Sequence, residues 1–240
     1  MPKLKLLCLH SFRTSSGFLH KQLTQYSNLA STIHQHAELH YLDAPHHAPH
    51  DAVAALPERF RAVVGTPNLQ WWNAVDHEDG TCSYEGCDVT LAHVADHMRQ
   101  HGPYDGVLGF SQGGSLAHLL ASLQRQSGPR GPADFSFVVC IAARLSRDTS
   151  HAALMKGAAA EPLDIGGLVL LGEEDTTVPP ALTEDLIRTI REPMVIRVPG
   201  CSHKVPRLDN DASAKVRGFF DRMAARASSH SDVSDDMGMV

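Results

Sequence analysis

A serine flanked by glycines lies near the middle of the chain, in the pattern Gly109-Phe110-Ser111-Gln112-Gly113. The pattern follows a short apolar run and precedes leucines spaced as on one face of a helix. Strand, tight turn and helix is the context of a nucleophile elbow, in which the serine takes strained backbone angles. Side chains in place of the two glycines would collide with the neighbouring strand and helix. Ser111 is therefore the predicted nucleophile.

A carboxylate and an imidazole follow two later strands. Asp175 comes after the apolar run 167–172, and His203 comes after the run 194–198. The chain order Ser, Asp, His is that of α/β-hydrolases, because a parallel sheet brings the carboxyl ends of its strands to one edge. A serine hydroxyl becomes nucleophilic when an imidazole takes its proton, and a carboxylate fixes the tautomer of that imidazole. This order predicts acyl transfer from an ester or thioester to a serine.

Acyl transfer also needs N–H donors for the oxyanion that forms on the attacked carbonyl. Losing one such donor costs about 3 kcal/mol of transition-state stabilisation. Gln112 directly follows the predicted nucleophile, and its backbone N–H heads the following helix, whose positive dipole end favours an anion. Phe12 lies in the loop after the first predicted strand. We expect the backbone amides of Phe12 and Gln112 to form the oxyanion hole.

Apolar runs that alternate with helical patterns predict an α/β fold: a mostly parallel central sheet with helices on both faces. The stretches 44–88 and 144–164 have little periodicity and are expected to form a cap of loops and short helices over the active-site edge. A single domain is expected over 1–227, followed by a disordered polar tail over 228–240. The expected strands are 3–9, 38–42, 107–108, 135–142, 167–172 and 194–198, and the expected helices are 18–34, 89–100 (capped by Asp88 or Thr90), 181–192, 209–226 and the one after the elbow. Residues 127–132 are expected to end that helix and form a loop.

The composition excludes several classes of protein. The 240 residues carry a net charge of −6 without a Lys/Arg run, which argues against a nucleic-acid partner. No apolar run reaches membrane-spanning length, and the N-terminus is interpreted as a strand in place of a signal peptide. The five cysteines are odd in number, so free thiols in a reducing compartment are expected. A cytoplasmic location follows from these two interpretations.

Several motifs together resemble the FSH-type serine hydrolases, an α/β-hydrolase family that includes fungal thioesterases releasing polyketides from their synthases. The resemblance covers most of residues 4–206. It implies Ser111 as nucleophile, Asp175 as acid and His203 as base, and it favours Asp175 over its neighbours Glu173 and Glu174. Ser11 stands where the family usually has Gly, so the geometry of the oxyanion hole around Phe12 can differ from that of the family. The matching segments are Leu-Cys-Leu-His-Ser-Phe-Arg, Leu-Asp-Ala-Pro-His, Trp-Trp, Tyr-Glu-Gly, Tyr-Asp-Gly-Val-Leu-Gly-Phe-Ser-Gln-Gly-Gly and Gly-Glu-Glu-Asp-Thr-Thr-Val-Pro.

Other residues admit both a functional and a structural interpretation. Trp71 and Trp72 either cover the core or form a wall of the acyl pocket, and Ser11 is a further candidate for substrate binding. Asp43 is expected to hold a local turn with its carboxylate on neighbouring N–H groups. Histidines between residues 34 and 50 suggest a metal site, but a serine triad needs no metal and no cofactor, so none is expected.

The predicted function is hydrolysis of carboxylic esters or thioesters through an acyl-enzyme. The resemblance suggests a narrower form, release of an acyl or polyketide chain from a thioester carrier, such as an acyl carrier protein. An acyltransferase would use the same triad. A catalytically silent small-molecule-binding protein on the same fold is a further alternative. The sequence fixes neither the substrate nor the oligomeric state.

Overall fold

Six parallel strands form the central sheet, in the order β10-β9-β8-β7-β1-β2. The structure, a computed structural model, describes residues 3–126 and 134–235, with side chains as far as residue 228. The predicted loop at 127–132 therefore lies outside the described residues. The strands are β1 (Leu4–Leu9), β2 (Ala37–Leu42), β7 (Gly106–Phe110), β8 (Phe137–Ile141), β9 (Gly166–Gly172) and β10 (Met194–Val198).

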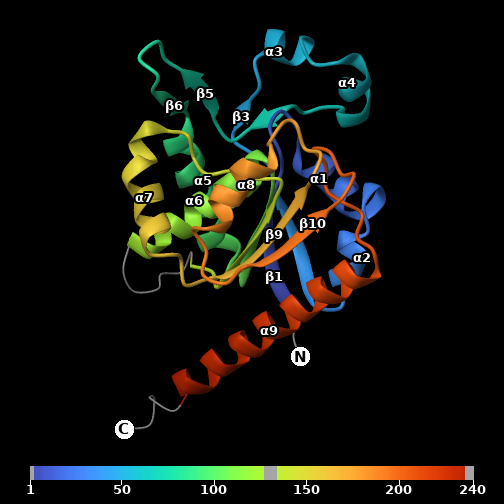
Figure 1. Cartoon of the computed structure of the whole chain (residues 1–240), viewed down its shortest axis with the longest axis vertical. Helices are drawn as coiled ribbons and strands as arrows, with labels where there is room; N and C mark the ends of the chain where they lie inside the picture. Colours follow the sequence, from blue (N-terminus) through green and yellow to red (C-terminus); the bar gives the residue numbers. More distant parts are fainter. Residues whose placement is uncertain (1–2, 127–133, 236–240) are drawn as a thin grey trace.

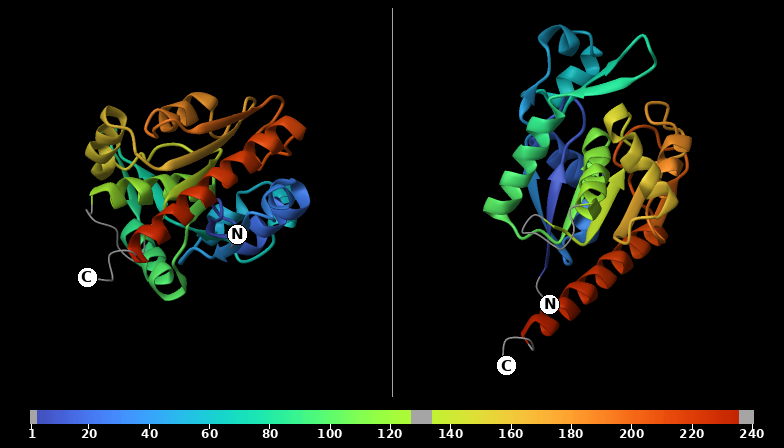
Figure 2. Two further views of the ribbon diagram at one scale, coloured as in Figure 1. Left: turned by 90° about the horizontal axis from the view of Figure 1, so that it is seen from below. Right: turned by 90° about the vertical axis from the view of Figure 1, so that its left-hand side faces the viewer.

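Helices cover both faces of this sheet (Figures 1 and 2), as predicted for an α/β fold. One face packs on a core that includes Leu19, Leu29 and Phe220, and the other on a core that includes Val94 and Leu116. The helices on the first of these faces are α1 (Ser16–Lys21), the π-helix η1 (Gln22–Tyr26), α2 (Leu29–Ile33) and α9 (Asn210–Asp235). The helices on the other face are α5 (Cys87–His101), α6 (Gln112–Gln126), α7 (Ala152–Ala160) and α8 (Pro180–Ile187). Every residue of β7, β8 and β9 is buried, which explains their continuous apolar runs.

The segment between β2 and α5 stands over the carboxyl ends of the strands (Figure 1). It contains short helices, as expected for a cap, and also short strands that the sequence did not indicate. The stretch after β8 meets this cap, because the Tyr84 N–H donates to Asp148 Oδ2 at 2.8 Å and the Cys82 N–H donates to Thr149 Oγ1 at 3.0 Å. Both weakly periodic stretches therefore contribute to one edge. The elements are β3 (His46–His47), α3 (His50–Ala54), α4 (Glu58–Val64), β4 (Leu69–Gln70), β5 (Asn73–Asp76), β6 (Cys82–Glu85) and the 3-10 helix η2 (Thr149–His151).

Three helical predictions need correction. The helix expected over 181–192 ends at Ile187, as α8. The helix expected over 18–34 is interrupted at Ser27, whose backbone is extended and whose hydroxyl accepts from the Leu29 N–H. Neither Asp88 nor Thr90 caps α5. The helix begins after Gly86, which has φ of 80°, and the Thr90 hydroxyl donates to the Trp71 carbonyl.

The predicted disordered tail is also corrected in part. Helix α9 continues through Asp235, so positions 228–235 are helical, and 236–240 lie outside the described residues. Residue Ser228 donates its hydroxyl to the Ala224 carbonyl at 3.0 Å. Extending a helix that tertiary packing has already nucleated fixes one more residue per hydrogen bond gained, so polar residues can continue it.

All five cysteines have free thiols and are buried. In the described part of the chain, no helix is both long and apolar enough to cross a membrane.

His118 is a fully buried histidine on α6 that makes stability depend on pH. Burial lowers its pKa to about 4 from the ordinary 6.5. The unfolded chain therefore binds more protons than the folded one between these two values, and stability falls as the pH falls through this window. At pH 5 this loss is on the order of 2 kcal/mol relative to pH 7.

We expect His118→Gln to reduce that acid sensitivity. The measurement is the free energy of urea unfolding at pH 7 and pH 5, and the difference between the two should shrink by about 2 kcal/mol in the variant. His47→Gln removes an exposed histidine and is the control that should leave the difference unchanged. Equal pH dependence in wild type and His118→Gln would contradict the prediction.

Candidate active site

Ser111 lies in a sharp turn between β7 and α6, with φ of 54°. Its N–H donates to the Ile141 carbonyl at 2.8 Å, and its carbonyl accepts from the Ser115 N–H at 2.9 Å. A Cβ on Gly109 would lie 2.1 Å from the Gly113 carbonyl oxygen. These contacts hold a non-glycine residue in the left-handed region, where strain is tolerated only when the surroundings fix it. The predicted elbow geometry is present.

The hydroxyl, imidazole and carboxylate predicted from the chain order lie together. His203 Nε2 is 2.9 Å from Ser111 Oγ, and His203 Nδ1 is 2.7 Å from Asp175 Oδ2. The Asp175 carboxylate therefore selects the tautomer with the proton on Nδ1, which leaves Nε2 free to accept from the serine. This arrangement can deprotonate the Ser111 hydroxyl as it attacks a carbonyl.

Asp175 is held by its own loop after β9. Its other oxygen, Oδ1, accepts from the Thr177 N–H at 2.9 Å and the Val178 N–H at 2.8 Å. The residue is 4% exposed, whereas Glu173 and Glu174 are exposed to solvent. Only Asp175 of the three acids contacts the imidazole.

The loops that carry Asp175 and His203 pack directly against each other. A Cβ on Gly172, at the end of β9, would lie 2.2 Å from the Cys201 carbonyl oxygen, so only glycine allows this approach. The Glu174 N–H donates to the same carbonyl at 3.0 Å. Phe110 lies against the imidazole, with ring centroids 5.2 Å apart. The position of His203 therefore depends on β9 and β7 as well as on its own loop.

Phe12 and Gln112, whose amides are expected to bind an oxyanion, line a cavity together with Ser111. Within the described ranges, neither the Phe12 N–H nor the Gln112 N–H donates a hydrogen bond to another residue. The Gln112 side chain bridges Trp71 and Trp72, accepting from the N–H of the first at 3.0 Å and donating to the carbonyl of the second at 2.9 Å. Both amides are thus available to a ligand.

A buried histidine shapes the loop that carries Phe12. His10 Nε2 accepts from the Ala44 N–H at 3.0 Å, so Nδ1 carries the proton and donates to the Ser11 carbonyl at 2.8 Å. Burial lowers the pKa of His10 to about 4, which keeps the ring neutral near pH 7. The positive φ in this loop is at Arg13, with φ of 56°, and not at Ser11. A side chain at position 11 therefore needs no left-handed backbone.

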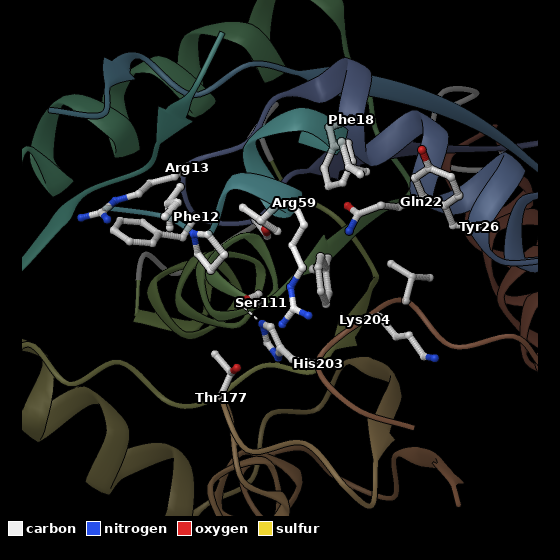
Figure 3. A pocket seen from close by; sticks show the side chains of 17 residues that line it. Phe12, Arg13, Phe18, Gln22, Tyr26, Arg59, Ser111, Thr177, His203 and Lys204 are labelled. Carbon is white, nitrogen blue, oxygen red and sulfur yellow. Dashed lines mark hydrogen bonds between the residues drawn. The ribbon is translucent and has the colours of Figure 1, made fainter. Parts of the chain in front are cut away.

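A large cavity of about 650 Å³ opens beside Ser111 and His203 (Figure 3). Ser11, a candidate for substrate binding, is among the residues that line it. Arg59 extends toward His203 from the cap in Figure 3, a placement that the sequence could not indicate because helix α4 was not recognised. Most of the lining is apolar and includes Phe12, Phe18, Leu56, Phe60, Val63 and Val205.

A second, small cavity of about 230 Å³ adjoins Ser111 and is lined by Phe12, Gln112 and residues of the cap. Trp72 forms part of its wall and stacks on Tyr84, with ring centroids 4.6 Å apart. Trp71 lines neither of the cavities at Ser111. It is 0% exposed, and its Nε1 donates to the His10 carbonyl at 2.8 Å, so it belongs to the core.

Asp43 and His46, two further candidates, make contacts that hold the fold together. The Asp43 carboxylate accepts from the Ser16 N–H at 2.7 Å, so it joins two distant segments instead of closing the expected local turn. His46 Nε2 lies 2.8 Å from the Gly86 carbonyl oxygen. Among the residues that the structure describes, no group of three or more His, Cys, Asp or Glu side chains is placed to hold a metal ion.

A family model described as serine hydrolase (FSH1) matches residues 1–215. The chain belongs to this serine hydrolase family. It is 31% identical over 188 residues to Esterase OVCA2 of Bos taurus, covering 74% of this chain and 79% of that protein.

Other relatives are matched over a smaller share of their own length. Esterase OVCA2 of Xenopus tropicalis is 32% identical over 144 residues, which cover 57% of this chain and 59% of that protein. A Schizosaccharomyces pombe protein named dihydrofolate reductase is 28% identical over 211 residues, which cover 85% of this chain and 44% of that protein. The chain thus spans about half the length of these two relatives.

Solved structures share the fold at low identity. The Zea mays acyl-protein thioesterase 2 has a TM-score of 0.56 and 19% identity, with 92% of this chain and 94% of that chain covered. Esterase PE8 has a TM-score of 0.56 and 18% identity, with 92% and 93% covered. The α/β-hydrolase fold predicted from the sequence is confirmed.

Proposed function

We propose that this protein is an esterase or thioesterase that works through an acyl-enzyme on Ser111. The observation that carries the proposal is the continuous hydrogen-bonded chain from Asp175 through His203 to the Ser111 hydroxyl, at a strained turn beside two free amides. Membership of a serine hydrolase family supports the same reaction class.

In the proposed mechanism, Ser111 Oγ attacks the carbonyl carbon while His203 Nε2 takes its proton. The developing oxyanion accepts from the Phe12 and Gln112 amides. Collapse of the tetrahedral intermediate expels the alcohol or thiol, which leaves with the proton from His203. Water then attacks the acyl-enzyme with His203 again as base, and the carboxylic acid departs as the serine regains its proton. Asp175 stabilises the imidazolium in both halves.

The two cavities at Ser111 support a substrate with distinct parts on either side of the reacting carbonyl. The large cavity, with apolar side chains such as Phe18 and Phe60, suits a medium or long apolar chain. The narrower form of the proposal is release of an acyl or polyketide chain from a thioester carrier. N-acetylcysteamine thioesters of increasing chain length test that form, and kcat/KM should rise with length until the cavity is filled.

A fluorophosphonate probe tests the proposal directly. The wild type is expected to take up one probe per chain, measured by intact-protein mass, whereas Ser111→Ala should take up none. Ser115→Ala is a matched control on the next turn of α6 and should be labelled like the wild type. A folded wild type that stays unlabelled would favour the non-catalytic binding protein. Transfer of the acyl group to an added alcohol, in competition with water, would favour the acyltransferase.

We also propose a cytoplasmic location, which the five free, buried thiols support because such thiols persist in reducing compartments.

A further inference from the structure

Arg144 is a half-buried cation in the small cavity at Ser111. The negative charge of Asp76 acts on it, but no acidic side chain of the described residues forms an ion pair with it. Its backbone N–H donates to Ser115 Oγ at 3.2 Å, but its guanidinium forms no hydrogen bond or ion pair with any residue of the described ranges. The Nε atom is shielded from solvent and unsatisfied. A buried donor left without a partner costs about 1–3 kcal/mol, so the guanidinium has hydrogen-bonding capacity that the described residues do not satisfy.

The acidic groups near Arg144 are already engaged. Asp76 pairs with Arg147, whose Nη1 lies 2.8 Å from Asp76 Oδ1. Asp148 accepts from the Tyr84 N–H and from the Ser150 N–H, each at 2.8 Å. Burial, and then the positive charge of Arg147, lower the pKa of the Arg144 guanidinium. The charge on Arg144 is thus less favourable here than in water, and a bound anion would stabilise it.

The small cavity has the shape and chemistry of a subsite for one end of a substrate. Trp72 and Tyr84 form a flat stacked wall, and Arg144 and Arg147 supply the cationic side. The cavity shares Phe12 and Ser111 with the large cavity, so a single substrate can reach both. Guanidinium groups bind carboxylate and phosphate with paired hydrogen bonds.

We propose that the small cavity binds an anionic group, a carboxylate or a phosphate, carried by the substrate on the side of the reacting carbonyl opposite its apolar part. This inference rests on the proposed function and adds a substrate class to it: esters or thioesters that are apolar at one end and anionic at the other. Arg144 is the principal anion-binding residue. Of the cations beside the large cavity, Arg59 and Lys204 are exposed to solvent, where ion pairs contribute little. The third, Arg13, is half-buried, and its Nη1 already donates to the Ala52 carbonyl at 2.9 Å.

Matched substrates that differ only in charge test the subsite. Hexyl hydrogen glutarate carries its carboxylate on the acyl part, and the hexanoate ester of glycolic acid carries it on the alcohol part. In the neutral partner of each, a primary amide replaces the free carboxylate and the ester is kept. The hexanoate ester of ethylene glycol phosphate tests a phosphate in place of the carboxylate. We expect kcat/KM of the wild type to favour at least one anion over its neutral partner by about ten-fold or more, as charge-assisted hydrogen bonds require.

Variants assign that preference to one arginine. Arg144→Gln should remove the preference, measured as the ratio of kcat/KM between each anionic ester and its neutral partner, and Arg144→Lys should restore part of it. Arg59→Gln, on the large cavity, is the matched control and should keep the preference. Turnover without any preference for an anion, or a preference lost in Arg59→Gln and kept in Arg144→Gln, would overturn the proposal.

Binding without chemistry separates this inference from the proposed function. Calorimetric titration of the preferred anionic ester into Ser111→Ala should give a Kd at least about ten-fold lower than that of its neutral partner. The double variant Ser111→Ala/Arg144→Gln should bind the two esters with equal Kd. Should the wild type be unreactive toward both esters and the fluorophosphonate, the proposed function would fail, yet this binding difference would still support the anion subsite. Equal affinities for the anionic and neutral esters would refute the subsite.

Discussion

An Asp175→Asn variant is expected to fold normally and to lose about 10,000-fold in kcat on p-nitrophenyl acetate. One oxygen of Asp175 accepts from two backbone N–H groups, at Thr177 and Val178, so the amide oxygen of the asparagine must take that place. Its NH2 group then faces His203 Nδ1 and forces that nitrogen to act as acceptor. The ring proton moves to Nε2, which can no longer accept the proton of Ser111.

The same loop provides the control for this prediction. Glu174→Gln also removes one negative charge, but its side chain is exposed, so kcat should stay within about two-fold of the wild type. Equal melting temperatures of the three proteins would show that the loss is chemical. An Asp175→Asn enzyme that retains a tenth of the wild-type kcat would show that another group orients His203.

The positions of Ser111, Asp175 and His203 could be predicted because each follows a strand of the parallel sheet. A parallel sheet places such strand ends along one edge, so residues far apart in sequence meet without any knowledge of side-chain packing. The steric role of the elbow glycines was predictable for the same reason: it depends on backbone geometry, which a short motif determines.

The residues of the cap could not be predicted in this way. Helix α4 has seven residues and strand β6 has four, so neither is long enough for a periodic pattern to emerge from its surroundings. Arg59 and Tyr84 lie on these elements, and Arg144 follows β8 in a loop. Their place beside Ser111 depends on contacts such as that between Tyr84 and Asp148, which join segments far apart in the chain.

Trp71 and Trp72 show where sequence reasoning stops. They are adjacent, and both are almost fully buried, yet only Trp72 reaches a cavity at Ser111. The difference comes from the Gln112 side chain, which fixes the backbone of both residues, and from the Trp71 indole, which bonds the His10 carbonyl beneath the elbow. Neither composition nor spacing distinguishes the two tryptophans.

Gly113→Ala is expected to damage both stability and catalysis. A Cβ at this position would lie 2.2 Å from the Leu9 carbonyl oxygen and 2.6 Å from the His10 carbonyl oxygen, so β1 and α6 must move apart. Because these are backbone atoms, no rotamer change relieves the contact, and we expect the free energy of unfolding to fall by roughly 3 kcal/mol or more. The loop after β1 carries Phe12, so its amide should move away from the oxyanion, lowering kcat/KM at least about 100-fold.

Gly17→Ala is the matched control, because it adds the same methyl group at a glycine of helix α1. There the new Cβ would meet only Ser15 Oγ, at 3.9 Å. Alanine favours a helix over glycine by up to about 1 kcal/mol, so this variant should be as stable as the wild type or slightly more stable, with unchanged kinetics. Urea unfolding and steady-state kinetics on the same ester measure both effects. If Gly113→Ala matched Gly17→Ala in stability and kcat/KM, the close approach of β1 to the start of α6 would not be what holds the Phe12 amide beside Ser111.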